Sequence, residues 1–226
     1  MTNKELLSDE VCLWEAAYLR FETPQQEIRK FKQRLIKLGA HRWSRETEVV
    51  ELFCGRGNGL KALAELGFRH LEGLDLSPRL LAQFEGHATC HVGDCRQLPF
   101  ANSSKDLLIV QGGLHHLTHL PTDLEQVLAE AKRVLRRRGR FVAIEPWLTP
   151  FLRFVHAVCA LQFSRRMSNK LDALATMIEY ERSTYERWLG CPDLILPRFK
   201  KYFDPEHISI GWGKLAFVGS PKADSR

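Results

Sequence analysis

Three glycines within five residues stand at the end of a short apolar run, in the segment VVELFCGRGNGLKALAELG that covers residues 49–67. Gly55, Gly57 and Gly59 permit backbone angles that other residues avoid, and they let a ligand approach the main chain closely. An apolar run, a glycine loop and a helix in this order are typical of a nucleotide-type cofactor site. By itself the pattern fits a nicotinamide dinucleotide, a flavin or an adenosyl compound.

Two acidic residues follow at the ends of the next two apolar runs. Asp75 in GLDLSP lies 18 residues beyond Gly57, and Asp94 stands near the start of GDCRQLPF. A carboxylate about 20 residues after a glycine loop accepts hydrogen bonds from ribose hydroxyls. A carboxylate at Asp94 is suited to an adenine amino group, beside the backbone amide of Cys95. Each acid alone also fits a plain turn or cap, but the order of strand, loop and acid favours a cofactor site.

Four segments in this order resemble a known family. VVELFCGRGNG, GLDLSP, GDCRQLPFANSSKDLLIVQGGLHHL and EAKRVLRRRGRFVAIEP together are similar to the class I S-adenosylmethionine (SAM)-dependent methyltransferases. The resemblance covers about residues 45–145 and the last apolar run of the chain. It implies SAM as the cofactor and S-adenosyl-L-homocysteine as its product.

The resemblance also implies where the cofactor is bound. Glu51 matches an acid near the methionine amino group, Asp75 matches the acid that binds the ribose, and Leu76 matches a residue that packs on adenine. The other matches are Phe53, Cys54, Gly55 and Gly57 in the loop around the methionyl and ribose parts, Asp94 and Cys95 at the adenine edge, and Gln111 and Gly112 near the sulfonium.

Phe53 departs from the family pattern, which usually has glycine at this position. Its ring gives up the closest backbone approach and is expected to shift the methionyl tail or to narrow the pocket. A non-catalytic SAM-binding module therefore remains an alternative to an enzyme. An NAD-dependent oxidoreductase is another, because it would share the glycine loop and Asp75.

Three histidines follow the fourth apolar run, in GGLHHLTHL. Methyl transfer needs a base only when the acceptor must lose a proton, and histidine titrates near neutrality. His115 and His116 are therefore the candidate catalytic residues. A metal site at the histidines would need a carboxylate partner, which the sequence does not place beside them, so no metal is predicted.

Acceptor contacts are expected from the same sheet edge and from helical segments around it. The candidates are Tyr18, His116, Glu145, Trp147 and Glu181. Glu181 falls on an apolar helical stripe, where a carboxylate needs a partner such as Arg153 or the acceptor itself. Frequent aromatic residues in these segments favour a small, partly apolar acceptor. Methylation of oxygen or nitrogen is expected on general grounds, and an RNA or protein acceptor is the alternative.

Positioning these residues requires an α/β fold. The apolar runs EVVELF, LEGLDL, TCHVGD, DLLIVQG, GRFVAIEP and KLAFVGS alternate with amphipathic segments, which predicts a mostly parallel sheet covered by helices. With the resemblance, this indicates a Rossmann-like, seven-stranded sheet. The predicted parts are an N-terminal helical lid (1–40), the SAM-binding core (41–146), a helical cap insertion (147–197) and closing strands (198–226). Within the lid, Thr23, Pro24 and Gln26 predict a capped helix that Gly39 ends.

The composition is that of a globular protein. Of the 226 residues, 44% are hydrophobic and 27% charged, and the net charge is +6. No run reaches the roughly 18–20 apolar residues of a membrane span, and the first residues lack a secretory pattern. We therefore expect a cytoplasmic monomer or homodimer that acts on a small molecule. Without a basic tail, nucleic acid is not favoured as a partner, although it is not excluded. The six cysteines form no C-x-x-C pair, which predicts reduced thiols.

Overall fold

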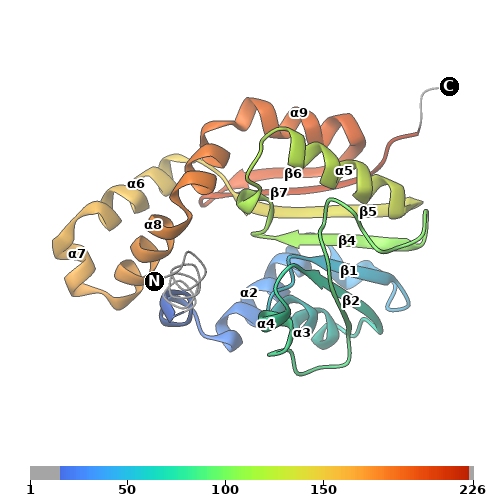
Figure 1. Ribbon diagram of the computed structural model, residues 1–226, viewed down its shortest axis with the longest axis horizontal. Helices are drawn as coiled ribbons and strands as arrows, with labels where there is room; N and C mark the ends of the chain where they lie inside the picture. The colour runs from blue at the N-terminus through green and yellow to red at the C-terminus, as the bar shows by residue number, and fades with distance from the viewer. Residues whose placement is uncertain (1–15, 224–226) are drawn as a thin grey trace, which may run out of the picture.

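The computed structural model describes residues 16–223, and a seven-stranded sheet forms its centre (Figure 1). The strand order is β3-β2-β1-β4-β5-β7-β6, with β1 to β5 parallel and β7 antiparallel to both of its neighbours. The strands are β1 (Glu48–Leu52), β2 (His70–Asp75), β3 (Thr89–Val92), β4 (Lys105–Gln111), β5 (Leu135–Pro146), β6 (Phe203–Gly211) and β7 (Lys214–Pro221). The predicted mostly parallel seven-stranded α/β sheet is confirmed.

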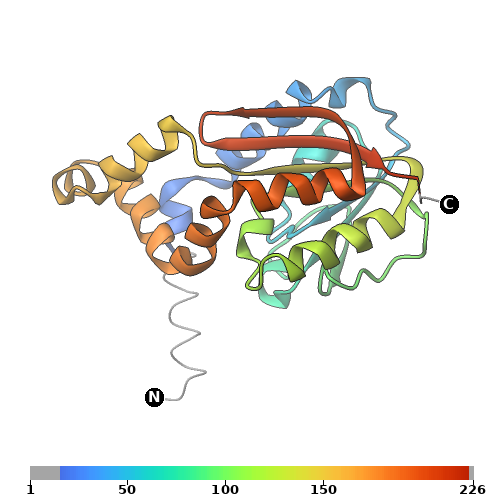
Figure 2. The same ribbon diagram turned by 90° about the horizontal axis from the view of Figure 1, so that it is seen from above.

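Helices cover both faces of the sheet (Figure 2). Buried side chains of α5 and α9 pack on one face, and those of α2 and α3 pack on the other. The helical elements are α2 (Pro24–Lys37), η1 (Ala40–Arg42), α3 (Asn58–Glu65), α4 (Pro78–Leu81), η2 (Leu114–His116), α5 (Thr122–Val134), α6 (Pro150–Ala160), α7 (Gln162–Met167), α8 (Asn169–Gly190) and α9 (Pro192–Tyr202). Residues 16–21 are also helical.

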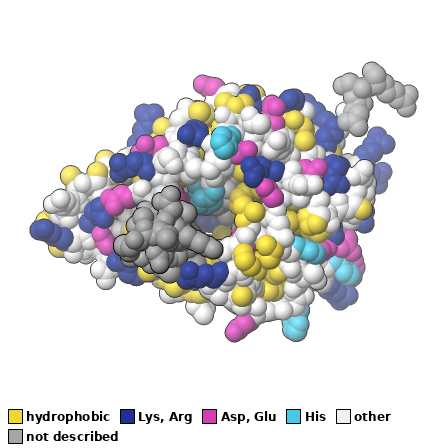
Figure 3. All heavy atoms as spheres, in the orientation of Figure 1, with side chains coloured by type: hydrophobic (Ala, Val, Ile, Leu, Met, Phe, Trp, Pro, Cys, Tyr) yellow, Lys and Arg dark blue, Asp and Glu magenta, His cyan; other side chains and the backbone are white. Residues whose placement is uncertain are grey.

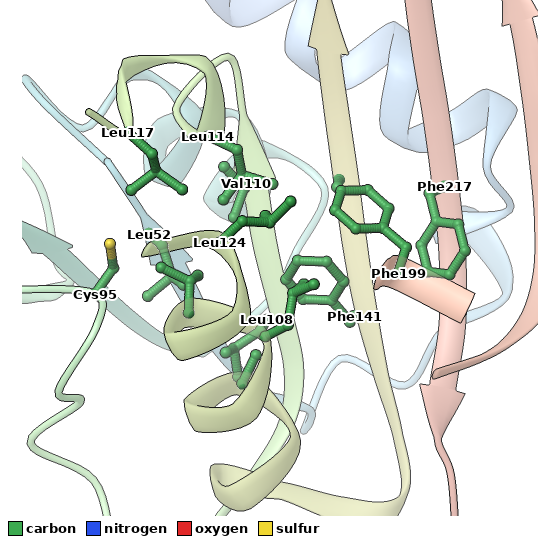
Figure 4. Packing of buried hydrophobic residues seen from close by; sticks show 14 of the residues in the cluster. Leu52, Cys95, Leu108, Val110, Leu114, Leu117, Leu124, Phe141, Phe199 and Phe217 are labelled. Atoms are coloured by element: carbon green, nitrogen blue, oxygen red, sulfur yellow. The ribbon is translucent and has the colours of Figure 1, made fainter. Parts of the chain in front are cut away.

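The face under α5 and α9 contains the aromatic part of the core (Figure 4). The Phe141 ring stacks on Phe203 with centroids 4.8 Å apart and meets Phe199 edge-on at 5.9 Å. Burying each ring contributes about 1.5–3 kcal/mol. Because these contacts fix β5 against β6 and α9, the carboxyl ends of the central strands are held at one edge.

The α2 helix begins and ends where its sequence predicts. The Thr23 hydroxyl accepts from the Gln26 amide at 3.3 Å, and the Gln26 side chain accepts from the Thr23 amide at 3.2 Å. This reciprocal capping box satisfies two donors of the first turn. Gly39 follows the helix with φ of 91°, an angle that glycine adopts readily.

The β5 strand is longer than the sequence indicates. The run GRFVAIEP predicts a strand from Gly139, but β5 starts at Leu135, directly after α5 ends at Val134. Two basic residues of this stretch pair with acids on other strands: Arg136 lies 2.7 Å from Asp106 of the neighbouring β4, and Arg140 lies 2.7 Å from Glu206 of β6, two strands away. These cross-strand partners explain why a charged run is extended here.

Helices α6, α7 and α8 extend beyond one end of the sheet (Figures 1 and 2). Trp188 of α8 is fully buried, and its indole donates to the Pro146 carbonyl at 2.9 Å, which ties this layer to the end of β5. Although α8 has 22 residues, no helix within residues 16–223 has both the length and the apolar character needed to cross a membrane. The division into lid, core, cap and closing strands stays a prediction. Residues 1–15 of the predicted lid lie outside the described residues. The predicted boundary at residue 197 falls inside α9.

Candidate functional site

A cavity of about 1080 Å³ lies at the carboxyl ends of β1, β2 and β4. Helices α2, α6 and α8 contribute the rest of its wall. The volume reaches the upper end of the roughly 300–1,000 Å³ of small-ligand pockets, so a cofactor and an acceptor fit together. A second cavity of about 670 Å³ lies at the opposite edge, and its described lining contains none of the candidate residues. Figure 3 shows hydrophobic side chains gathered beside a hollow, and Lys and Arg dispersed around that face.

The glycine loop places Phe53 in a left-handed backbone conformation. Its φ is 56°, which costs a residue with a side chain about 1–2 kcal/mol. This explains the family preference for glycine at this position. The ring lines the cavity and packs on Gly113, where an added Cβ would lie 2.3 Å from the phenyl ring. Phe53 and Gly113 therefore form a matched large and small pair.

We expect Gly113→Ala to destabilise the protein by about 1–3 kcal/mol through overpacking against Phe53. Denaturant unfolding measures the change. In the Phe53→Gly/Gly113→Ala double variant both the ring and the Cβ of residue 53 are gone, so the effect of the second substitution should largely vanish. Gly190→Ala is the control, because a Cβ there meets nothing within 4 Å. Equal stability of the Gly113 and Gly190 variants would contradict the pairing.

Asp75 connects the end of β2 to the glycine loop. Its Oδ2 accepts from the Gly55 amide and its Oδ1 accepts from the Ser77 amide, both at 2.8 Å. Each carboxylate oxygen has a further lone pair, so the group can still accept from a ligand in the cavity that it lines. Next to it, Leu76 is 63% exposed and offers an apolar surface to the same cavity.

The predicted adenine edge contains a residue that the sequence analysis missed. The Arg96 guanidinium lies 2.6 Å from Asp94 and 3.2 Å from Asp123 at the start of α5. Arg96 hydrogen bonds lower the pKa of Asp94. Cys95 is buried, and burial raises the pKa of its thiol to about 12, so it is a neutral wall residue. All five described cysteines are free thiols.

A buried contact joins α2 to the glycine loop. Asn58 of α3 donates to Glu27 of α2 at 2.6 Å, and the Tyr18 hydroxyl donates to the other oxygen of the same carboxylate. Burial and then the charge of Glu27 raise the pKa of the Tyr18 hydroxyl far above its usual range. Tyr18 lines the cavity, as expected of an acceptor contact, although its hydroxyl is directed to Glu27.

Glu145 and His115 form a buried pair behind the cavity wall. Glu145 is 0% exposed and accepts from the Gly113 and Leu114 amides at 2.9 Å each. The His115 Nδ1–H donates to the same carboxylate at 2.9 Å, so the Nε2 of this ring faces the other way. Glu145 itself is absent from the cavity lining, so its position suits orientation of His115 rather than direct contact with an acceptor.

Glu181 of α8 completes a polar cluster with the two histidines. Its carboxylate oxygens lie 3.6 Å from His115 Nε2 and 3.7 Å from His116 Nδ1, and all three residues line the cavity. Burial opposes a charge on His115, but the hydrogen bonds of Glu145 and Glu181 outweigh it and raise its pKa to about 9. Burial and the adjacent His115 charge lower the pKa of His116 to about 4.

The remaining candidates divide between the cavity and the core. Gln111 and Gly112 line the cavity at the end of β4. Gly57 caps α3 with φ of 73° and lies just behind the lining residues. Trp147 belongs to the hydrophobic core and is 8% exposed, and the cavity lining does not include it. The acceptor side instead has an apolar wall from α6 and α8, made by Phe151, Leu152, Val155, Leu174, Met177 and Ile178.

Comparisons with known proteins agree with this geometry. Residues 50–143 match the methyltransferase domain family. The ubiquinone/menaquinone biosynthesis C-methyltransferase UbiE of Rubrivivax gelatinosus is 29% identical over 160 residues, which are 67% of this chain and 61% of that protein. The demethylmenaquinone methyltransferase of Thermotoga maritima is 35% identical over 103 residues, 43% of each chain.

Solved structures show the same fold. The PH0226 protein of Pyrococcus horikoshii superposes with a TM-score of 0.68 at 20% identity, over 92% of this chain and 97% of its own. A putative SAM-dependent methyltransferase of Methanococcus maripaludis gives 0.62 at 14% identity, over 96% and 93%. The chain contains a methyltransferase domain at residues 50–143, and its fold resembles that of a SAM-dependent methyltransferase. It spans 61% or less of the length of the curated relatives named here.

The cavity fits SAM. The Glu51 Oε2 and both side-chain polar atoms of Gln111 are buried and have no hydrogen-bond partner among residues 16–223. Buried polar atoms normally have partners, so these atoms indicate a missing polar ligand. The methionyl end of SAM carries an ammonium and a carboxylate that can pair with them. Burial and then the charge of Glu27 raise the pKa of Glu51 well above its usual value, as expected for an acid that awaits a cation.

We expect Glu51→Gln to stabilise the protein without cofactor while weakening SAM binding. Because the folded-state pKa of Glu51 exceeds the unfolded-state value, the folded chain binds its proton more tightly, and stability falls as pH rises through the folded-state pKa. Removing the ionisable group should add about 1–3 kcal/mol to the free energy of unfolding at high pH. Loss of a charge-assisted hydrogen bond should raise the Kd for SAM about 10-fold or more.

Denaturant unfolding from pH 5 to 9 and calorimetric SAM titration measure these two effects. The control is Glu65→Gln, since Glu65 is exposed and pairs with Lys32. If the stability of Glu51→Gln falls with rising pH as steeply as that of the parent, Glu51 does not cause the pH dependence of stability.

Proposed function

We propose that this methyltransferase transfers the methyl group of SAM to a hydroxylated aromatic ring that carries an apolar substituent. The observation that carries the proposal is the division of the cavity wall. The polar cluster of His115, His116 and Glu181 lies beside the apolar residues of α6 and α8. A hydroxyl suits the first surface, and an apolar substituent suits the second.

The chemistry follows from the acceptor. Bound SAM supplies an electrophilic methyl group. The acceptor hydroxyl loses its proton, which places electron density on the oxygen and on the adjacent ring carbons. An electron pair of the acceptor forms the new bond to the methyl carbon, and the pair of the broken carbon–sulfur bond stays on sulfur. The protein orients the ring and takes up the proton, and orientation alone can supply about 7–11 kcal/mol of the barrier. We assign the contact with the hydroxyl to His116 and Glu181.

The relatives favour carbon as the atom that is methylated. Curated relatives are named as C-methyltransferases of ubiquinone and menaquinone biosynthesis, and a mouse relative that is 39% identical over 54 residues is named a polyprenyl-benzoquinol methylase. We therefore propose a quinol-type ring and carbon methylation, in which the ring carbon that receives the methyl group then loses its hydrogen as a proton to water and the ring becomes aromatic again. Oxygen methylation, expected on general grounds from the sequence, is the second candidate, because the same cluster faces the hydroxyl in both reactions.

The test supplies SAM with a labelled methyl group and offers four acceptors: an alkylated hydroquinone, unsubstituted hydroquinone, transfer RNA and an unfolded protein. We expect label in the alkylated ring, and carbon-13 NMR of the product distinguishes a ring methyl from a methyl ether. Transfer to RNA or protein alone would contradict the proposal. Tight SAM binding without any transfer would identify a non-catalytic module instead.

A further inference from the structure

The cluster of His115, His116 and Glu181 has the composition of a metal site. Each residue offers one ligand atom, and these atoms all lie within 4.8 Å of one another. Within residues 16–223, no other three histidine, cysteine or acidic residues come together in this way. We propose that the cluster binds a divalent transition-metal ion that prefers imidazole ligands, of the Zn²⁺ type, and presents it to the acceptor hydroxyl. Binding of the ion does not depend on the proposed function. Only its contact with the acceptor hydroxyl rests on that proposal.

The distances suit one ion. Zn²⁺ binds nitrogen and carboxylate oxygen at about 2.0–2.2 Å in a tetrahedron, which places neighbouring ligand atoms roughly 3.3–3.6 Å apart. The Glu181 Oε2 lies 3.6 Å from His115 Nε2, and its other oxygen, Oε1, lies 3.7 Å from His116 Nδ1. With one ligand atom from each residue, all three atoms lie within 4.8 Å of one another, so a rotation of the carboxylate brings one oxygen to an ion between the two rings.

The surroundings of His115 support the same conclusion. A metal-binding histidine usually donates its second ring N–H to a carboxylate or carbonyl, which fixes the tautomer and the ring plane. Glu145 does this for His115 at 2.9 Å, and two backbone amides hold Glu145 in turn. Because Glu145 is fully buried, its position is set by the fold rather than by a ligand. The Nε2 that it leaves available is the atom that faces Glu181.

The site keeps room for a substrate. Its three protein ligands come from η2 and from α8, and all three face the cavity of about 1080 Å³. Catalytic zinc sites have three protein ligands and an open fourth position. An acceptor hydroxyl in that position would lose its proton more readily, because the ion stabilises the resulting oxyanion.

The sequence analysis predicted no metal because it found no carboxylate near the histidines. Glu181 is 65 residues beyond His116 in the sequence, and only the packing of α8 on η2 brings them together. The structure therefore places beside the histidines the carboxylate that the sequence alone does not indicate.

The test titrates the full-length protein, freed of metal by a chelator, with Zn²⁺ and with Mg²⁺ in a calorimeter. We expect one Zn²⁺ per chain and no Mg²⁺ binding, since Mg²⁺ prefers oxygen ligands. Co²⁺ in place of Zn²⁺ should give the absorption bands of a low-coordinate site. Glu181→Gln and His116→Asn should each raise the Kd for Zn²⁺ about 100-fold or more. Glu145→Gln, which perturbs a positioning residue, should raise it about 10–100-fold.

Glu179→Gln is the matched control on the same helix, because Glu179 pairs with Arg165 and not with the cluster. It should bind Zn²⁺ like the parent. No saturable binding to the parent, or binding that survives both Glu181→Gln and His116→Asn, would overturn the proposal. Circular dichroism of each variant confirms that it folds. SAM titration of the same samples keeps the two proposals apart, since the cofactor residues lie outside the cluster: SAM binding without Zn²⁺ binding removes only the metal site.

Discussion

Asp75→Asn should weaken SAM binding by about 100-fold and lower stability by about 1–3 kcal/mol, because one of two backbone amides loses its acceptor. The carboxylate holds the glycine loop through Gly55 and the start of α4 through Ser77. An amide of the same shape keeps one acceptor oxygen but presents a donor at the other position. We expect the ribose to lose one charge-assisted hydrogen bond, worth about 1.5–3 kcal/mol. A loss near 2.7 kcal/mol corresponds to about 100-fold in Kd.

Calorimetric titration with SAM and with its demethylated product measures the effect. Asp106→Asn is the control, because Asp106 also accepts from a backbone amide, that of Glu48 at 3.0 Å, at the opposite edge of the sheet. The control should bind SAM like the parent. If both variants bind equally well, Asp75 does not hold the ribose and the cofactor lies differently in the cavity.

The sequence predicts the parallel part of the fold well because local patterns determine it. Thr23, Gln26 and Gly39 specify the limits of α2 through bonds within a few residues, and the structure confirms them. The apolar runs before Phe53 and Asp75 become β1 and β2 for the same reason. Neither α9 nor β6 was located individually. In β6, nearly every residue from Asp204 to Gly211 is exposed on this sheet edge, so its hydrophobic pattern is weak.

In the candidate site, contacts between residues far apart in the sequence are the part that the sequence does not predict. Glycines and acids at strand ends are found by their spacing, and the structure brings them to one cavity. The Glu27–Asn58 contact and the Glu145–His115 pair join residues about 30 positions apart, and no local pattern signals them. Glu145 was expected near the acceptor because of its place at a strand end. Its two amide contacts instead make it a support for the histidine turn.

The protein keeps several unfavourable features in this one region. Phe53 has a left-handed backbone, and Glu51 and Gln111 have buried polar atoms without partners among the described residues. Natural proteins retain such features where function requires them. All three residues line the cavity at the end of β1 or β4, where the cofactor is expected. Their clustering argues for a ligand site more strongly than any one of them does.

Glu145→Ala is expected to cost about 3–5 kcal/mol of unfolding free energy. Removing one member of a buried ion pair leaves the other charge without compensation. Here the substitution also removes the acceptor of two amides and leaves His115 facing an empty space. Although burial alone would raise the pKa of Glu145, the bond to His115 outweighs burial and lowers it, so the carboxylate is ionised at neutral pH. The free energy of unfolding of a typical domain is about 5–15 kcal/mol, so this substitution would remove a large part of it.

Urea unfolding with a chelator present measures this cost in metal-free protein. Glu206→Ala is the control, because Glu206 forms an exposed pair with Arg140 and should cost no more than about 1 kcal/mol. Glu145→Gln provides an intermediate, since its amide oxygen still accepts from the Gly113 and Leu114 amides while the charge is gone. If Glu145→Ala does not fold, urea unfolding of Glu145→Gln still measures the effect of removing the charge. Equal stabilities for the Glu145 and Glu206 variants would show that the histidine turn does not depend on this carboxylate. The positioning of His115, and with it the orientation of the whole cluster, would then need another explanation.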